Sequence, residues 1–228
     1  MRSKNYKAFI SLKINSYKIG KDGEYLAFDY GSYNMYVTDE LSGTALVIGY
    51  STENVIKGVN LGPYPVADLL DPVNGYICVF SFGSASAARI NSNSQTIIST
   101  IRVGYRPHEK APDTYTGFIY VVDEFLNAIH VIHTRNNSEV SSINLVNCFV
   151  DVAFNQHMGN IIAYNGCSNN VSVLNFRSLV LLKNIALGNQ TISLLLNSDH
   201  GTVFVSNLES VSIVIYSGNG RYIQCVML

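Results

Sequence analysis

Short apolar runs alternate with polar, turn-forming residues along most of the chain, and no run has the length and 3.6-residue spacing of a helix. The same succession of segments recurs every 42 residues: an apolar run, a polar turn, a strongly hydrophobic run and two further apolar runs. The strongly hydrophobic run begins five times at this interval, at Tyr36, Cys78, Tyr120, Ile162 and Phe204. A fixed period of this length predicts a repeat architecture.

Two columns of turn residues accompany the repeat. Seven residues before each hydrophobic run lies an Asp or Asn, namely Asp29, Asp71, Asp113, Asn155 or Asn197. Three residues before the run lies Gly75, Gly117, Gly159 or Gly201, with Tyr33 in the first copy. An Asp or Asn side chain can cap a turn, and glycine accepts a positive φ. Each pair therefore predicts a hairpin turn between two strands.

Four short strands per unit, rich in Val, Ile, Tyr and Phe, are typical of the blade of a β-propeller. We therefore predict an all-β protein with one small propeller domain of five four-stranded blades. The predicted blades cover residues 20–61, 62–103, 104–145, 146–187 and 188–228. Residues 1–19 match the second half of a blade, so we expect an extra N-terminal strand segment that closes the ring. The alternative is six blades, one of them incomplete.

Several segments resemble the Tyr-Val-Thr-Asn (YVTN) repeat propellers. The segments are Pro65–Pro72, Gly75–Val79, Met35–Asp39 and Val103–His108, and the resemblance extends from residue 20 to residue 228. It implies a propeller fold and a place among surface-layer, secreted and adhesive proteins. Related propellers include lactonase-like enzymes, so the resemblance leaves the activity open. Members commonly have about seven blades, so five copies imply a small or incomplete ring.

The composition excludes several classes of protein. Hydrophobic residues reach 47 %, charged residues only 14 %, and the net charge is −1. These values exclude a disordered chain and a nucleic-acid binder that depends on positive charge. No apolar stretch suits a membrane span and no signal peptide is visible, so we expect no membrane insertion and leave the location unknown. The four cysteines lack a CxxC pair; we expect free, mostly buried thiols, with a disulfide as the alternative.

One face of the predicted propeller is the natural binding site, because two sets of loops meet there. These are the loops that enter each innermost strand and those between the second and third strands. Aromatic residues with a nearby arginine are typical of binding hot spots. The candidate binding residues are Tyr64, Phe82, Tyr105, Arg106, His108, Phe125 and Phe149. For Phe82 and Phe125 the alternative is packing between the blades as part of the core.

Charged residues interrupt the innermost strands, where small apolar residues are expected. They are Asp68, Glu109, Lys110 and Asp151. We predict a paired or solvated cluster, including an ion pair between Asp68 and Lys110, since a buried charge needs a partner. The alternative is a channel mouth that holds a cation or a polar ligand.

The histidines do not predict a metal site. His130 and His133 are three residues apart on a predicted strand, so their side chains point to opposite faces and we expect both at the surface. No Gly-x-Ser-x-Gly elbow, phosphate-binding loop or His-Glu-x-x-His motif occurs. We therefore predict no catalytic residues.

These patterns favour a non-enzymatic binding or scaffold module that recognises a protein or a glycan and carries no cofactor. Few charges and many Asn, Ile and Tyr residues favour a surface, adhesion or virion component of an archaeal virus or archaeon, within a larger assembly. The alternative is a small lactonase-like hydrolase. In that case Asp68, Glu109 and Asp151 would hold calcium or magnesium, and His108 would act as the base.

Overall fold

The computed structural model describes residues 22–71, 74–144, 149–187, 191–197, 202–207, 212–216 and 222–227. All regular elements in these ranges are β-strands. Among these residues no helix is long and apolar enough to cross a membrane.

Twenty strands form five antiparallel sheets, each with four strands in sequence order. The first sheet contains β1 (Gly23–Asp29), β2 (Asn34–Asp39), β3 (Thr44–Gly49) and β4 (Asn54–Asn60). The second contains β5 (Pro65–Asp71), β6 (Tyr76–Ser81), β7 (Ser86–Asn91) and β8 (Thr96–Arg102). The third contains β9 (Pro107–Pro112), β10 (Phe118–Asp123), β11 (Ala128–His133) and β12 (Ser138–Asn144).

The last two sheets repeat this plan. The fourth contains β13 (Phe149–Asn155), β14 (Asn160–Asn165), β15 (Asn170–Asn175) and β16 (Leu181–Ala186). The fifth contains β17 (Thr191–Asn197), β18 (Thr202–Asn207), β19 (Ser212–Tyr216) and β20 (Tyr222–Met227). Each sheet falls within one 42-residue unit, and we number the sheets as blades 1 to 5.

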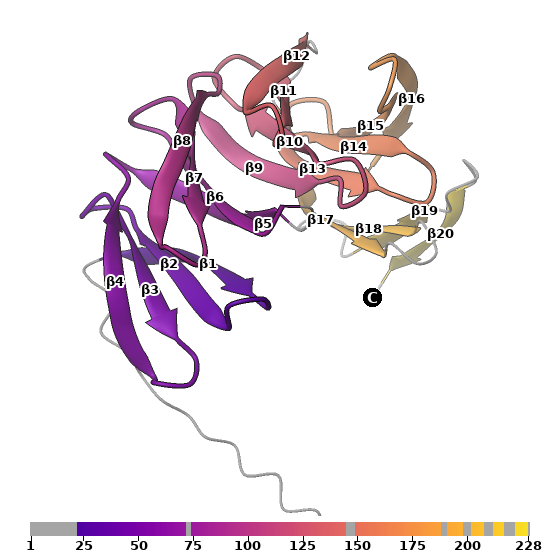
Figure 1. The fold of residues 1–228 in the computed structure, drawn as a ribbon. Helices are drawn as coiled ribbons and strands as arrows, with labels where there is room; N and C mark the ends of the chain where they lie inside the picture. Colours follow the sequence, from indigo (N-terminus) through magenta and orange to yellow (C-terminus); the bar gives the residue numbers. More distant parts are fainter. Residues whose placement is uncertain are drawn as a thin grey trace, which may run out of the picture.

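The blades follow one another in an arc, with the first strand of each toward the centre and the fourth toward the outside (Figure 1). Contacts between innermost strands link β1 to β5, β5 to β9, β9 to β13 and β13 to β17. The prediction of five four-stranded propeller blades is therefore confirmed. The predicted closing segment, and the alternative of a sixth incomplete blade, concern residues 1–19 and lie outside the described residues.

The blades share the same local irregularities. The pairing between third and fourth strands shifts register at one place in each blade, for example between Val47 and Ile48 and, 42 residues later, between Arg89 and Ile90. The innermost strands also shift near their starts, as between Pro65 and Ala67. Such bulges increase strand twist, so each copy of the repeat makes a blade of the same shape.

The first turns of blades 1 to 4 are built as the sequence predicts. In blade 3 the Asp113 carboxylate accepts hydrogen bonds from the Tyr115 N–H at 2.9 Å and the Thr116 N–H at 3.2 Å. The residue that closes the turn is left-handed in every copy described: φ is 68° at Gly75, and 54° at Tyr33, which stands where the other copies have glycine. The turn geometry therefore persists even without glycine.

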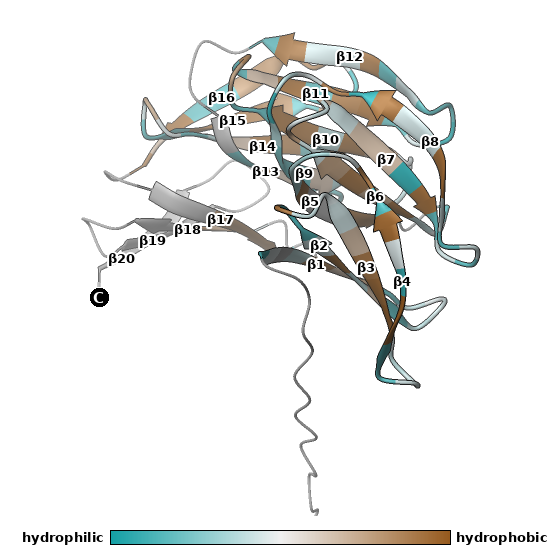
Figure 2. Cartoon of the chain, turned by 90° about the vertical axis from the view of Figure 1, so that its left-hand side faces the viewer, coloured by the Kyte–Doolittle hydropathy of each residue, from teal (hydrophilic) through white to brown (hydrophobic). Residues whose placement is uncertain are grey.

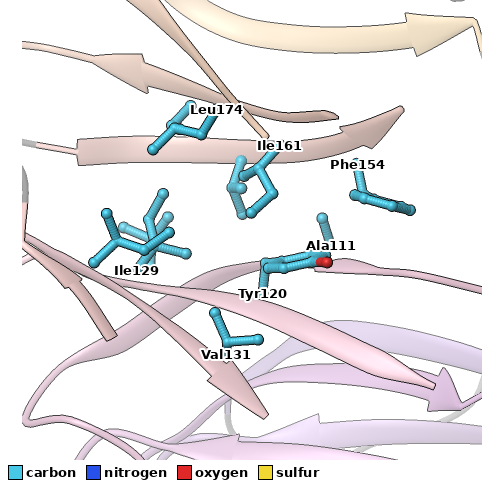
Figure 3. Close-up of a cluster of buried hydrophobic side chains, with 11 residues drawn as sticks. Ala111, Tyr120, Ile129, Val131, Phe154, Ile161 and Leu174 are labelled. Atoms are coloured by element: carbon cyan, nitrogen blue, oxygen red, sulfur yellow. The ribbon is translucent and has the colours of Figure 1, made fainter. Parts of the chain in front are cut away.

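The core lies between neighbouring blades, because each described cluster of buried hydrophobic residues combines side chains of two consecutive blades. Brown hydrophobic strand centres and teal hydrophilic turns alternate through the arc (Figure 2). Between blades 3 and 4, Tyr120 stacks on Phe154 with ring centroids 5.1 Å apart, and Ile129, Ile161 and Leu174 fill the space beside them (Figure 3). Burying such side chains contributes about 1.5–3 kcal/mol each. Blades 3 and 4 thus stabilise each other through this shared core.

Candidate binding site on the loop face

We call the end of the blades where the innermost strands begin the loop face. A cavity of about 250 Å³ opens there across blades 1, 2 and 3. Since each strand reverses direction, the turns between second and third strands lie at the same end as the loops that enter the next blade. The lining residues are Tyr25, Glu40, Tyr64, Val66, Phe82, Arg106, Pro107, His108 and Glu124. We call this the loop-face cavity.

Four residues of the predicted binding set line the cavity: Tyr64, Phe82, Arg106 and His108. Two others form a separate pair on blade 3, where Tyr105 and Phe125 have ring centroids 5.4 Å apart. Phe125 is 62 % exposed, so the alternative that it packs between the blades is wrong. The predicted Phe149 starts strand β13, but its side chain lies outside the described residues.

The middle wall of the cavity is a stack of three side chains from blades 2 and 3. The Arg106 guanidinium carbon lies 4.6 Å from the centroid of the Phe82 ring, and Tyr64 meets Phe82 edge to face at 6.3 Å. The Phe82 N–H donates to the Tyr64 carbonyl at 2.9 Å, which ties the two loops together. Phe82 is half-buried by these contacts and still borders the cavity, so it does not pack as core between the blades.

The other lining residues were missed in the sequence. Glu40 and Glu124 occupy the same repeat position as Phe82, directly after the second strand of their blades. This 42-residue relationship could have identified them, but isolated acidic residues in turns are common at protein surfaces. Tyr25 lies on β1, and the Lys110 ammonium sits 5.2 Å from its ring centroid.

Two members of the predicted channel cluster, Glu109 and Lys110, contact residues outside that cluster. His108 Nδ1 lies 3.7 Å from Glu109 Oε1 and 3.7 Å from Glu124 Oε1, so the histidine stands between two acidic residues. Lys110 contacts Tyr25. The Asp68 side chain lies outside the described residues, so the predicted Asp68–Lys110 ion pair stays a prediction.

Asp151 is the electrostatically unusual member of the cluster. Burial raises the pKa of its carboxyl to about 6, and the charge of Glu109 acts in the same direction. Hydrogen bonds from the Leu194 N–H at 3.0 Å and the Val152 N–H at 2.8 Å, together with His108, oppose the rise. Asp151 is therefore mostly ionised at pH 7 and becomes protonated as the pH falls through about 6.

A buried histidine, His130, contacts the aspartate that holds one loop of the cavity wall. Asp123 at the end of β10 accepts hydrogen bonds from the N–H groups of Tyr105 and Arg106, the loop that carries the cavity wall. His130 Nε2 lies 3.6 Å from Asp123 Oδ2, and His130 Nδ1 lies 2.7 Å from Glu139 Oε1. We call Asp123, His130 and Glu139 the blade-3 clasp.

The clasp corrects one expectation. The His130 side chain is only 7 % exposed, so the prediction that it is a surface residue is wrong. The alternation of a strand assigns a residue to a face but does not say what covers that face. Burial also raises the pKa of the Asp123 carboxyl in principle, yet three backbone N–H donors and His130 outweigh it and the pKa of Asp123 is lowered.

The metal-ligating residue types are dispersed. In the described part of the chain no three His, Cys, Asp or Glu side chains converge as a metal site would require. Cys78 is free and buried, and burial raises the pKa of its thiol to about 12. Cys167 is disulfide-bonded, so the expectation of free thiols is wrong for this residue.

Comparison with known proteins defines the class of the fold. No protein-family model matches the chain, and no curated protein matches it. Hydrazine synthase from Kuenenia stuttgartiensis is similar in structure over 93 % of this chain and 70 % of that chain, with a TM-score of 0.74 and 17 % identity. A likeness at this identity shows the fold alone: the chain is a β-propeller protein.

Proposed function

We propose that this propeller is a non-enzymatic binding module that recognises a protein or a glycan through its loop face. The observation that carries the proposal is the loop-face cavity itself, in which three successive blades bring aromatic rings, a guanidinium and carboxylates together. Rigid aromatic groups beside a few oriented polar groups are the usual composition of a recognition site. Tyr105 and Phe125 extend the aromatic surface beyond the cavity.

The repeat supports this assignment. The first turns of blades 1 to 4 keep one capping plan from copy to copy, as a purely structural feature should. At the loop face the repeat position after the second strand changes from Glu40 to Phe82 to Glu124. Changing chemistry on a constant scaffold is how repeat proteins build a particular binding surface.

The proposed setting is a surface, adhesion or virion component of an archaeal virus or archaeon, within a larger assembly. The amide- and hydroxyl-rich composition with little charge supports it. So do exposed aliphatic residues on the outermost strands, such as Ile56, Ile98 and Leu182, which offer further contact area at the rim. The resemblance to YVTN propellers points in the same direction.

The test is a screen of the intact protein against a glycan array and candidate surface proteins, with Tyr64→Ala and Phe82→Ala beside the wild type. The proposal expects a ligand whose binding both variants weaken while their melting temperatures stay near the wild-type value. Metal analysis and a lactone-hydrolysis assay accompany the screen. The hydrolase proposal would replace the binding proposal if two results were found together. These are a tightly bound calcium or magnesium ion, and lactone hydrolysis that Glu109→Gln abolishes.

A further inference from the structure

The geometry points to a neutral, polyhydroxylated ligand for the loop-face cavity: one sugar ring, stacked on Tyr64 and hydrogen-bonded by Glu124 and Arg106. This inference rests on the proposed binding function and narrows it to one ligand chemistry.

The charges around the cavity are mixed and closely spaced. Glu40 and Glu124 bring two carboxylates, Arg106 brings a guanidinium, and His108 lies beside Glu124. The guanidinium of Arg106 would repel a cationic ligand, and the carboxylates would repel an anionic ligand. Either repulsion at short range would weaken binding. A neutral ligand avoids both costs and still uses every polar group. Hydroxyl groups suit this lining because each can donate to a carboxylate and accept from a guanidinium.

The rings of the cavity are not equally available. Arg106 lies over Phe82 and Lys110 lies over Tyr25, so cations of the protein already occupy a face of each ring. Tyr64 is 46 % exposed and touches Phe82 only edge to face. The hydrogen bond from the Phe82 N–H to the Tyr64 carbonyl holds the backbone at Tyr64, and the edge-to-face contact with Phe82 positions the ring. Tyr64 therefore offers a rigid apolar platform for the C–H face of a sugar.

The size of the cavity supports a single ring. At about 250 Å³ it is smaller than the ~300–1,000 Å³ of pockets for drug-sized ligands. A folded protein partner would instead spread over the loop face, where Tyr105 and Phe125 are also exposed. This difference allows an experiment to separate a sugar from a protein ligand.

The experiment titrates the intact protein with neutral sugars (glucose, galactose, mannose and N-acetylglucosamine), with cationic glucosamine and with anionic sialic acid. Binding is followed by NMR or calorimetry. We expect at least one neutral sugar to bind in preference to both charged sugars. Tyr64→Ala and Glu124→Gln should each weaken that binding about tenfold, since a lost stacking contact or charged hydrogen bond has that effect. The matched control is Tyr115→Ala, which removes a 76 % exposed tyrosine from the first turn of blade 3, at the opposite end from the cavity. Tyr105→Ala, which removes an exposed tyrosine of the loop face outside the cavity lining, is measured beside it.

The titrations have three results that would contradict a neutral sugar ligand. Preference for glucosamine or sialic acid overturns the neutral ligand, and so does equal loss of affinity in Tyr64→Ala and Tyr105→Ala. If no sugar of the panel binds, the sugar inference fails. The proposed binding function survives that failure when a protein ligand is weakened by Tyr64→Ala and Tyr105→Ala together, and falls only when no ligand depends on the loop face. Melting curves for all variants separate lost contacts from lost folding.

Discussion

The two ends of the blades use the same backbone plan for different purposes. At the end that carries the first turns, Asp29, Asp71, Asp113 and Asn155 all accept hydrogen bonds from N–H groups two or three residues ahead. At the loop face the residue after the second strand is Glu40, Phe82 and Glu124 in blades 1 to 3, and these three blades combine the differences into one cavity. The repeat positions that stay the same therefore form the structural turns, and the repeat positions that differ between blades form the candidate binding site.

The blade-3 clasp is a buried structural element that also holds the loop of the cavity wall through Asp123. A variant that disrupts the clasp should therefore lower the stability of the protein most. In Gly104→Ala the new Cβ would overlap Asp123 Oδ2 and His130 Nε2, and the residue must also hold a φ of +50°. We expect a loss of about 3 kcal/mol of stability from strain and from the disturbed Asp123 hydrogen bonds.

The control for Gly104→Ala is Gly62→Ala, the same repeat position in the preceding loop. Gly62 has a φ of +91°, but no atom lies within 4 Å of the added Cβ. Gly62→Ala should lose stability only through backbone strain. Its melting temperature should therefore be about 4–8 °C higher than that of Gly104→Ala. Equal melting temperatures would show that the overlap of the added Cβ with Asp123 and His130 costs no stability.

A turn variant should affect stability alone. Asp113→Ala removes the acceptor for the N–H groups of Tyr115 and Thr116 and for the Thr116 hydroxyl. We expect a loss of about 2 kcal/mol in chemical denaturation. Ligand affinity should not change, because Asp113 lies at the opposite end of blade 3 from the cavity. A weakened affinity in the folded variant would mean that the two ends are coupled.

The sequence reveals the fold more completely than the site. The 42-residue period, with its Asp or Asn and Gly columns, was sufficient to predict the blades, because the same turns and strands recur in each copy. It did not predict the left-handed turn residues Ala85, Gln95 and Leu179, where the hydrogen-bonded strands on either side impose a φ that glycine would adopt more easily.

For the site, sequence reasoning identified Tyr64, Phe82, Arg106 and His108 because they fall in loops of one face. It missed Tyr25, which a strand alternation cannot distinguish from a core residue. It also misplaced His130, since burial there depends on the neighbouring Asp123 and Glu139. Contacts between elements decide these positions, and a single sequence does not contain them.

A substitution of Asp151 should change stability less than Asp113→Ala does, and the change should depend on pH. The pKa of its carboxyl is about 6 in the folded chain, above its ordinary value of 3.8, so the folded state binds the proton more tightly than the unfolded state. The contribution to stability is fully present below about pH 4 and is lost as the pH rises through 6.

Asp151→Asn should therefore be more stable than the wild type at pH 7 by about 1 kcal/mol, after allowance for partial solvent screening, and equally stable at pH 4. Thermal melts across this pH range measure the difference. A wild-type curve that runs parallel to that of Asp151→Asn at every pH would contradict the assigned protonation.

The smallest expected change in stability belongs to Glu124→Gln. Its carboxylate lies 3.7 Å from His108 and both side chains are partly exposed, so the pair contributes little to folding. We expect stability within about 0.5 kcal/mol of the wild type. A larger loss would place Glu124 among the structural residues and weaken its role in recognition.

The most direct test of the division between structural turns and a recognising loop face is a dissociation constant measured three times with one ligand from the screens. The proteins are the wild type, Tyr64→Ala and Asp113→Ala, all below their melting temperatures. The structure predicts about tenfold weaker binding for Tyr64→Ala and an unchanged constant for Asp113→Ala. An unchanged constant for Tyr64→Ala, or weaker binding for Asp113→Ala alone, would contradict the assignment of the loop face as the site of recognition.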